Sequence, residues 1–171
     1  IENIMIDREE IDRAGASLRD ELKGAIDTAR KNIDAFHAMQ KPEDKGIITS
    51  PGVRCWIKTN PVEKVGLYIP GGTAPSLSTV LMLGIPAKLA GCKEIILCAP
   101  PGQDGLIHPA ILYCASSIGI NRIYRVGGAQ AIAAMAYGTE TIPSVDKIFG
   151  PGNPYVTVAK QLVSLENVAI D

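Results

Sequence analysis

Four glycine-rich segments are the parts of this sequence whose residue types could do chemistry. They are Pro70-Gly71-Gly72-Thr73, Pro101-Gly102-Gln103-Asp104-Gly105, Gly127-Gly128-Ala129-Gln130 and Gly150-Pro151-Gly152-Asn153. Glycine is used where the backbone must approach a ligand closely, and a helix that follows such a segment offers free N–H groups to an anion. Together the segments predict a phosphate or pyrophosphate site, although each one alone also fits an ordinary tight turn.

Known phosphate-binding motifs define this site only in part. The stretch from Gly150 to Tyr155 begins like the dinucleotide pattern G-x-G-x-x-G but lacks its third glycine. The pattern G-x-x-x-x-G-K-[ST] is absent, which argues against an ATPase. The segments by themselves therefore predict a nucleotide or phosphate site of an atypical kind.

Short apolar runs alternate with helical segments after residue 60 and supply the frame for these loops. The predicted strands are Val65–Ile69, Glu94–Ala99, Arg122–Val126, Lys147–Phe149 and Val168–Ile170. The predicted helices are Ser76–Ala90, Pro109–Ile118, Ala129–Tyr137 and Pro154–Ser164. This alternation predicts an α/β fold, a Rossmann-like open parallel sheet of about five strands with helices on both faces. Parallel strands end at one edge of a sheet, so the four glycine segments are brought together there.

The first 60 residues have a different character. Apolar residues recur every three or four positions and predict one face of a helix, formed by Leu18, Leu22, Ile26, Ala29, Ile33 and Phe36. This face must dock on the rest of the chain, on further sequence or on a second subunit. Residues 47–60 look irregular, with Trp56 as a packing residue. We expect residues 1–60 to form an N-terminal helical arm and linker, and 61–171 the nucleotide-site domain.

Composition excludes several classes of function. The 171 residues carry a formal net charge of −1, which gives no basic footprint for nucleic acid or for a membrane surface. No apolar run approaches the roughly 20 residues of a spanning helix. The N-terminus, Ile1-Glu2-Asn3, has neither an initiator Met nor the shape of a signal peptide. We expect a soluble, cytoplasmic protein.

Cysteines and histidines offer little for a metal or a nucleophile. Cys55, Cys92, Cys98 and Cys114 form no C-x-x-C pair and lie in apolar stretches, so we expect reduced, buried thiols. A zinc site would need more ligands than the two histidines supply. We expect His37 to be a surface or interface residue, and His108 to be a helix-capping or loop residue.

Longer blocks around the glycine segments resemble one family of enzymes. The blocks are Val65–Pro75, Ser78–Leu83, Val126–Ala134, Tyr137–Pro143, Asp146–Ile148 and Gly150–Asn153. In order and spacing they closely resemble histidinol dehydrogenase from about Val65 to the end, and the N-terminal helix fits more loosely. The resemblance implies a homodimeric, zinc-containing enzyme of histidine biosynthesis. Such enzymes oxidise L-histidinol to L-histidine through an aldehyde, by two successive hydride transfers to NAD.

The resemblance also implies roles for individual residues. Tyr68, Gln130 and Asn153 match the family's NAD-contacting positions, and Ser78 matches a serine near the substrate. Zinc ligands and a catalytic Glu-His pair are implied only downstream of Asp171. No catalytic or metal-binding residue is therefore expected in this chain, which we expect to be an incomplete fragment, inactive alone.

Two other interpretations remain. A stand-alone nucleotide- or phosphate-binding module without catalysis would need natural termini, and the missing Met and the stop at Asp171 argue against it. An aldehyde-type dehydrogenase would need a nucleophilic cysteine in a loop at the ligand edge. Cys92 and Cys98 lie beside or within a predicted strand instead.

Overall fold

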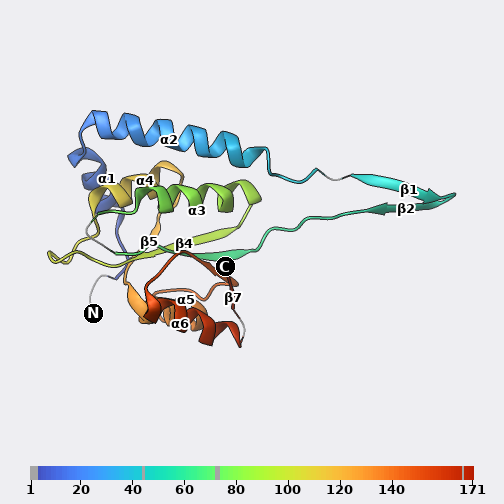
Figure 1. Ribbon diagram of the computed structural model, residues 1–171. Helices are drawn as coiled ribbons and strands as arrows, with labels where there is room; N and C mark the ends of the chain where they lie inside the picture. The colour runs from blue at the N-terminus through green and yellow to red at the C-terminus, as the bar shows by residue number, and fades with distance from the viewer. Residues whose placement is uncertain (1–3, 44, 72–73, 167) are drawn as a thin grey trace.

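A five-stranded parallel sheet forms the centre of the computed structural model, which describes residues 4–43, 45–71, 74–166 and 168–171 (Figure 1). The sheet strands are β3 (Lys64–Tyr68), β4 (Glu94–Ala99), β5 (Arg122–Arg125), β6 (Lys147–Phe149) and β7 (Ala169–Ile170). Their order is β5-β4-β3-β6-β7, with every neighbouring pair parallel. The predicted α/β class and parallel sheet are therefore confirmed.

Helices cover both faces of this sheet. They are α1 (Arg8–Ser17), α2 (Asp20–Ala38), α3 (Leu77–Ala90), α4 (Pro109–Ser117), α5 (Gly128–Tyr137) and α6 (Pro154–Ser164). In Figure 1, α3 and α4 lie on one face, with α2 above them and α1 beside α4, while α5 and α6 lie on the other face. Each face has its own apolar cluster, because side chains alternate across a strand. Leu67 and Leu97 point to the α3–α4 side, whereas Ile96 and Cys98 point to the α5–α6 side.

The apolar face of the N-terminal helix docks on the rest of the chain. Leu22, Ile26, Ala29 and Ile33 pack against the cluster that includes α3. Two residues, Phe36 and Leu18, were wrongly assigned to this face. Phe36 is exposed near the end of α2, and Leu18 lies between α1 and α2, where the chain turns. The turn separates two helices where the periodicity had suggested one.

The N-terminal segment also extends the sheet, which the sequence pattern did not predict. The N–H of Ile6 donates to the carbonyl of Ile123 over 2.9 Å, and the N–H of Arg125 donates to the carbonyl of Ile4 over 2.7 Å. These bonds lie at the β5 edge, where exposed strand groups would otherwise be unpaired. Glu10 of α1 then pairs with Arg125, with both carboxylate oxygens 2.6 Å from one guanidinium nitrogen.

A β-hairpin occupies part of the stretch that was expected to be irregular. β1 (Gly46–Ser50) and β2 (Val53–Trp56) pair antiparallel and extend away from the sheet in Figure 1. Every residue of the two strands is exposed within this chain. Trp56 is 63% exposed, so the expectation that it packs was wrong for the chain taken alone. The alternation of side chains was hard to recognise because neither face of the hairpin is covered here.

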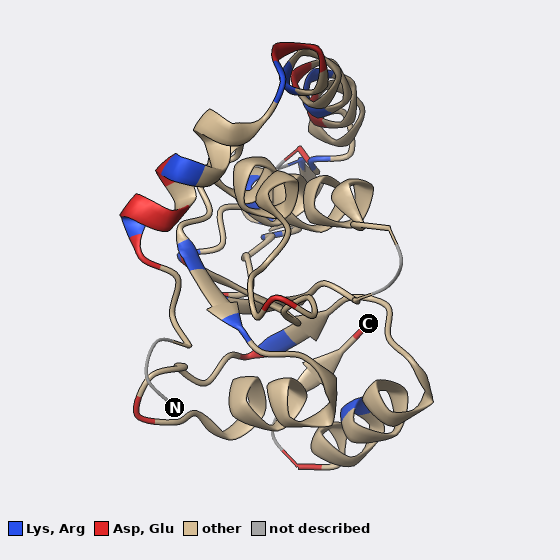
Figure 2. Cartoon of the chain, turned by 90° about the vertical axis from the view of Figure 1, so that its left-hand side faces the viewer, with Lys and Arg blue, Asp and Glu red and all other residues tan. Residues whose placement is uncertain are grey.

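Charge is distributed unevenly between the two helical layers. α1 and α2 carry many acidic and basic residues, whereas α5 and α6 together carry only Lys160 (Figure 2). Among the described residues, no helix is both long enough and apolar enough to cross a membrane. The layer formed by α5 and α6 is therefore almost neutral, which makes its one cation conspicuous.

Candidate functional site

The order of the strands locates the candidate site. From β3 the chain moves outward through α3 to β4 and through α4 to β5, and then returns through α5 to β6 on the other side of β3. In such open sheets, ligands bind at the carboxyl ends of the strands where this order reverses. Here that point lies between β3 and β6. Gly72 and Thr73 of the loop after β3 lie outside the described residues.

Tyr68 connects the end of β3 to the start of α5. Its side chain is buried, and its hydroxyl oxygen accepts a hydrogen bond of 3.0 Å from the N–H of Gly128. Gly128 has a φ of +72°, a conformation that favours glycine, so the chain can turn sharply into the helix. The tyrosine thus holds the glycine turn after β5 against the central strand.

Gly150 brings the loop after β6 equally close to β3. Its φ is +131°, and a methyl group placed on it would overlap the carbonyl oxygen of Tyr68. This position therefore requires glycine for two reasons, its positive φ and its close contact with the backbone of Tyr68. Two separate loops are fixed against Tyr68, one through Gly128 and one through Gly150.

Asn153 and Gln130 stand at the starts of the two helices that follow these loops. The Oδ1 atom of Asn153 accepts a hydrogen bond of 3.0 Å from the N–H of Val156 and so caps α6, which leaves the side-chain amide group to donate to a ligand. Gln130 is exposed in the first turn of α5 and folds back over Gly128. Both amides lie where helix N–H groups and the helix dipole favour an anion.

The structure thus brings together three of the four predicted site residues. Tyr68, Gln130 and Asn153 belong to segments linked by the contacts of Gly128 and Gly150. Ser78 is exposed in the first turn of α3, the helix that follows β3. Within the described residues, no hydrogen bond joins Ser78 to the other three.

Lys160 and Asp171 are residues at this edge that the pattern did not single out. Lys160 of α6 is buried; its ammonium pairs with the carboxylate of Asp171, at the end of β7, and donates to the carbonyl of Gly150 over 3.1 Å. Burial lowers the pKa of Lys160 below its ordinary value. One signal could have found it, because Lys160 lies four residues after Val156 and three before Val163, both buried on the inner face of α6.

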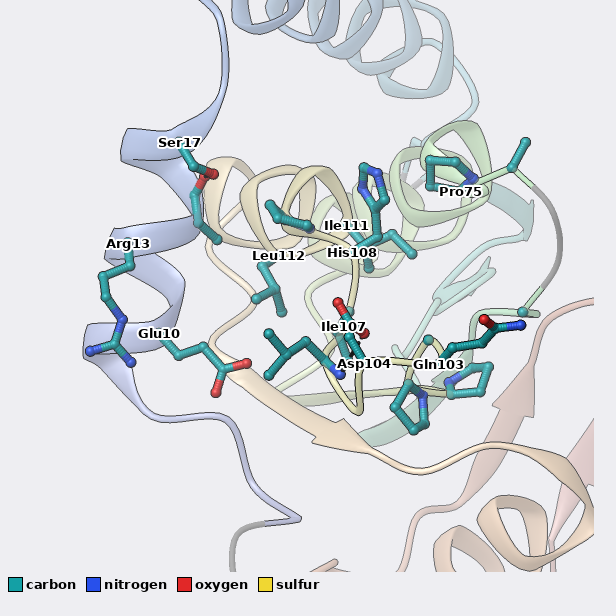
Figure 3. Close-up of a pocket in the computed structure, with 18 of the residues that line it drawn as sticks. Glu10, Arg13, Ser17, Pro75, Gln103, Asp104, Ile107, His108, Ile111 and Leu112 are labelled. Carbon is teal, nitrogen blue, oxygen red and sulfur yellow. Dashed lines mark hydrogen bonds between the residues drawn. The ribbon is translucent and has the colours of Figure 1, made fainter.

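A cavity of about 760 Å³ opens on the side of the sheet that α3 and α4 cover (Figure 3). It lies between α1, with Glu10 and Arg13, and the loop that follows β4, with Asp104 and Ile107. Pro100 forms part of its wall and also backs the turn at Gly127, where a methyl group would overlap the proline ring. Pro70 and Gly71, from the loop after β3, also line the cavity, so it borders the β3–β6 edge.

Most of the predictions about the cysteines and about His108 are confirmed. Burial raises the pKa of Cys98 and of Cys114 to about 12, and it also raises the pKa of Cys92. These thiols are poor nucleophiles, which argues against the aldehyde-type dehydrogenase. Cys55 is exposed on β2, so its expected burial was wrong. His108 caps α4 as predicted, with its Nδ1 accepting from the N–H of Ala110 over 3.2 Å.

His37 belongs to no metal-binding cluster among the described residues. His37 is partly exposed on α2, and its Nδ1 atom lies 2.7 Å from Oε1 of Gln40. In the ranges that the structure covers, no group of three or more His, Cys, Asp or Glu residues is arranged to hold a metal ion. The described residues therefore do not by themselves fit a zinc site.

Known proteins match this chain along its whole length. The model of the histidinol dehydrogenase family matches residues 1–171. Histidinol dehydrogenase from Bacteroides thetaiotaomicron is 60% identical over 168 residues, which cover 98% of this chain and 39% of that protein. The protein of the same name from Shewanella oneidensis is 56% identical over 173 residues, with 99% and 39% covered.

A solved structure agrees with these relatives. The crystal structure of histidinol dehydrogenase from Elizabethkingia anophelis matches with a TM-score of 0.97 and 57% identity, covering 100% of this chain and 40% of that one. The chain thus spans about 40% of the length of the relatives that it matches. With a family match over every residue and a nearly superimposable relative, this chain belongs to the histidinol dehydrogenase family.

Proposed function

We propose that this chain supplies the NAD site of an enzyme that oxidises L-histidinol to L-histidine through histidinaldehyde, in the final steps of histidine biosynthesis. The observation that carries the proposal is the meeting of two family-like glycine loops at one end of the sheet. The loop after β5 and the loop after β6 both contact Tyr68, at the point where the strand order reverses. Such a point is where open α/β sheets bind nucleotides.

The residues at this edge fit a dinucleotide in chemistry as well as in position. α5 and α6 begin there; Tyr68 holds the N–H of Gly128, Asn153 holds that of Val156 and Pro154 has none, so the N–H groups of Ala129 and Tyr155 are left to face a pyrophosphate. Gln130 and Asn153 add exposed amides that can donate to phosphate or ribose oxygens. When bound, NAD would accept hydride from the substrate carbon. This chain's own part would be to bind and orient the cofactor.

Individual roles follow within the same proposal. We assign Gln130 and Asn153 to direct contact with NAD, from the N-terminal turns of their helices. Tyr68 would contact NAD from the end of β3 while it fixes the turn at Gly128. Ser78 would lie near the substrate, a role supported by its exposure in the first turn of α3 and by the family motif.

Catalysis itself is assigned to residues outside this chain. The family motifs imply zinc ligands and a Glu-His pair downstream of Asp171, and the described residues offer no cluster that could replace them. We expect the 171-residue chain alone to bind NAD weakly or not at all and to show no turnover. The four cysteines are free, as in most cytoplasmic proteins, and we place the reaction in the cytoplasm.

The test is a steady-state assay of the protein at the length of its relatives, with NADH formation followed on addition of L-histidinol. Gln130→Ala and Asn153→Ala should each raise the KM for NAD about 5- to 150-fold, the effect of losing one hydrogen bond to a charged or polar group. The KM for histidinol should change much less. Absence of histidinol-dependent NADH formation by the wild-type protein would contradict the proposed reaction.

Control variants separate binding from folding. Asn153→Ser keeps an oxygen that can cap α6 but loses the amide, so it should keep the stability of the protein and still weaken NAD. Gln161→Ala removes an exposed glutamine from the middle of α6 and should leave both KM values unchanged. If the affinity for NAD is unaltered in all the Gln130 and Asn153 variants, NAD does not bind at this edge.

We propose further that the whole protein is a homodimer and that the β1–β2 hairpin is part of its interface. The hairpin exposes Ile47, Ile48, Val53 and Trp56, and a two-stranded ribbon with uncovered faces is at best marginally stable in water. Light scattering of the full-length protein should give twice the chain mass. Ile48→Asp should shift it toward the monomer, and a wild-type monomer at micromolar concentration would contradict the dimer.

A further inference from the structure

Lys160 is the one charged side chain that is buried among the residues the structure describes, at 7% exposure. Its partner is Asp171, which follows β7 and keeps 37% of its side-chain surface in contact with solvent. Burying an ammonium group is costly unless it is paired and hydrogen-bonded, and a buried pair seldom stabilises a fold more than apolar residues would. Only the Lys160 half of this pair is buried, so its ammonium depends on the polar groups that it contacts.

The pair engages both backbone groups of a single residue. The N–H of Gly150 donates to Oδ2 of Asp171 over 2.9 Å, and its carbonyl accepts from the Lys160 ammonium over 3.1 Å. The other carboxylate oxygen of Asp171 pairs with the same ammonium. Gly150, Lys160 and Asp171 thus form a closed ring of three interactions, which we call the Gly150 clamp.

The clamp acts on a residue whose conformation is demanding. Gly150 has a φ of +131° and lies so close to Tyr68 that no side chain fits between them. An unsupported glycine in a loop can adopt many backbone conformations, and ordering it costs conformational entropy. With both its polar groups held, Gly150 directs the chain through Gly152 to Asn153, the cap of α6.

We propose that Lys160 and Asp171 are positioning residues for the cofactor: by clamping Gly150 they fix the loop from Gly150 to Asn153 in the shape that receives the NAD pyrophosphate. This inference rests on the proposed function and extends it to two residues that need not touch the cofactor. A preorganised loop binds more tightly because its ordering has already occurred before the ligand arrives. Burial lowers the pKa of Lys160, and the adjoining carboxylate favours the charged form that the clamp needs.

The experiment uses the full-length enzyme and three variants. Lys160→Met removes the ammonium, and Lys160→Met/Asp171→Leu replaces the whole pair with apolar side chains. Lys93→Met serves as the matched control, because Lys93 also pairs with a carboxylate, that of Glu63, but in an exposed position just before β4 begins. The measurements are the KM for NAD, the KM for histidinol, kcat and the thermal midpoint Tm.

A positioning role predicts a specific split between these quantities. Both Lys160 variants should raise the KM for NAD about tenfold or more, the usual effect of losing a charge-assisted hydrogen bond, while the KM for histidinol moves less than about twofold. The double variant should recover the Tm lost in the single variant but not its affinity for NAD, since apolar pairs restore stability and cannot hold Gly150. Lys93→Met should match the wild type in both KM values.

Other outcomes would overturn the proposal. A double variant with the KM for NAD of the wild type would show that the clamp serves stability alone. Equal rises in the KM for NAD and for histidinol, or loss of folding in both Lys160 variants, would also assign the pair to the fold. Failure of the proposed function is distinguishable, because then the wild-type enzyme itself would form no NADH from histidinol.

Discussion

The parallel sheet and the β1–β2 hairpin are built from the same kinds of residue and reach opposite environments. Ile96 in β4 is 0% exposed, whereas Ile48 in β1 is 73% exposed. Cys98 in β4 is buried, whereas Cys55 in β2 is exposed. The difference lies in what the rest of the chain provides. Helices cover both faces of the sheet, and within this chain nothing covers the hairpin strands.

The comparison shows which parts of this chain can be stable alone. Burying a large aliphatic side chain contributes roughly 1.5–3 kcal/mol, so each residue such as Ile96 repays part of the entropy cost of folding. Ile48 contributes almost nothing of this kind within the chain. Within the described residues, the strands of the sheet are therefore covered on both faces, whereas the strands of the hairpin are covered on neither.

The largest expected contrast concerns thiol reactivity. Burial raises the pKa of Cys98 from an ordinary 9.0 to about 12, so at mildly alkaline pH its reactive thiolate is about 1000-fold rarer than that of an ordinary thiol. A disulfide reagent added to the native chain at that pH should label Cys55 quickly and leave Cys98 and Cys114 unmodified. Denaturant should make all of them react. Peptide mapping by mass spectrometry identifies the labelled sites, and fast native labelling of Cys98 would show that the sheet is not tightly packed.

The next contrast compares two glycines with positive φ. Gly150→Ala should lower the free energy of unfolding by about 3 kcal/mol or more, because the new methyl group meets both an unfavourable φ and the backbone of Tyr68. Gly52→Ala, in the hairpin turn, meets an unfavourable φ of +81° but open space, so it should cost only about 1–2 kcal/mol. Urea denaturation of the two variants measures both values. Equal costs would contradict a steric contribution from the contact between Gly150 and Tyr68.

Most of the sheet could be predicted from local sequence, and the hairpin could not. The runs around Leu67 and Ile96 are apolar along their length because both faces are covered, and this continuous pattern is easily recognised. Each run also ends at glycine or proline. The hairpin has apolar residues on a ribbon that nothing in this chain covers, so its sequence pattern does not distinguish a buried face from an exposed one. The bonds of Ile6 to β5 were missed because an isolated pairing leaves no periodicity to detect.

The candidate site was predictable where residue type alone has meaning. Gly150 and Asn153 follow a strand and precede a helix, and such residues suggest a cap and a close approach. Lys160 was not predicted, because a lysine on a helix is usually solvated, and its partner Asp171 is eleven residues away. Contacts of that kind depend on how α6 sits on the sheet, and local sequence does not determine this.

A smaller effect is expected at the helix cap, inside the well-packed part of the molecule. Asn153→Ala removes the acceptor for the N–H of Val156 and should lower the free energy of unfolding by about 0.5–2 kcal/mol. Asn153→Asp keeps an oxygen in the same place, adds a favourable charge at a helix start and should preserve stability. Urea denaturation without NAD checks this. If the two variants are equally destabilised, the cap bond contributes nothing to the fold.

The smallest effect is expected in the hairpin, and there a small value is the informative one. Ile48→Ala should change the free energy of unfolding of the 171-residue chain by less than about 0.5 kcal/mol, because the side chain is already in water. Ile96→Ala, the same substitution in β4, should cost about 2–5 kcal/mol through a cavity in a closed core. In the full-length protein, where we propose that a second subunit covers the hairpin, Ile48→Ala should become costly as well and its cost should depend on protein concentration. A cost that stays small at every concentration would leave the hairpin uncovered and would separate the two regions even more sharply.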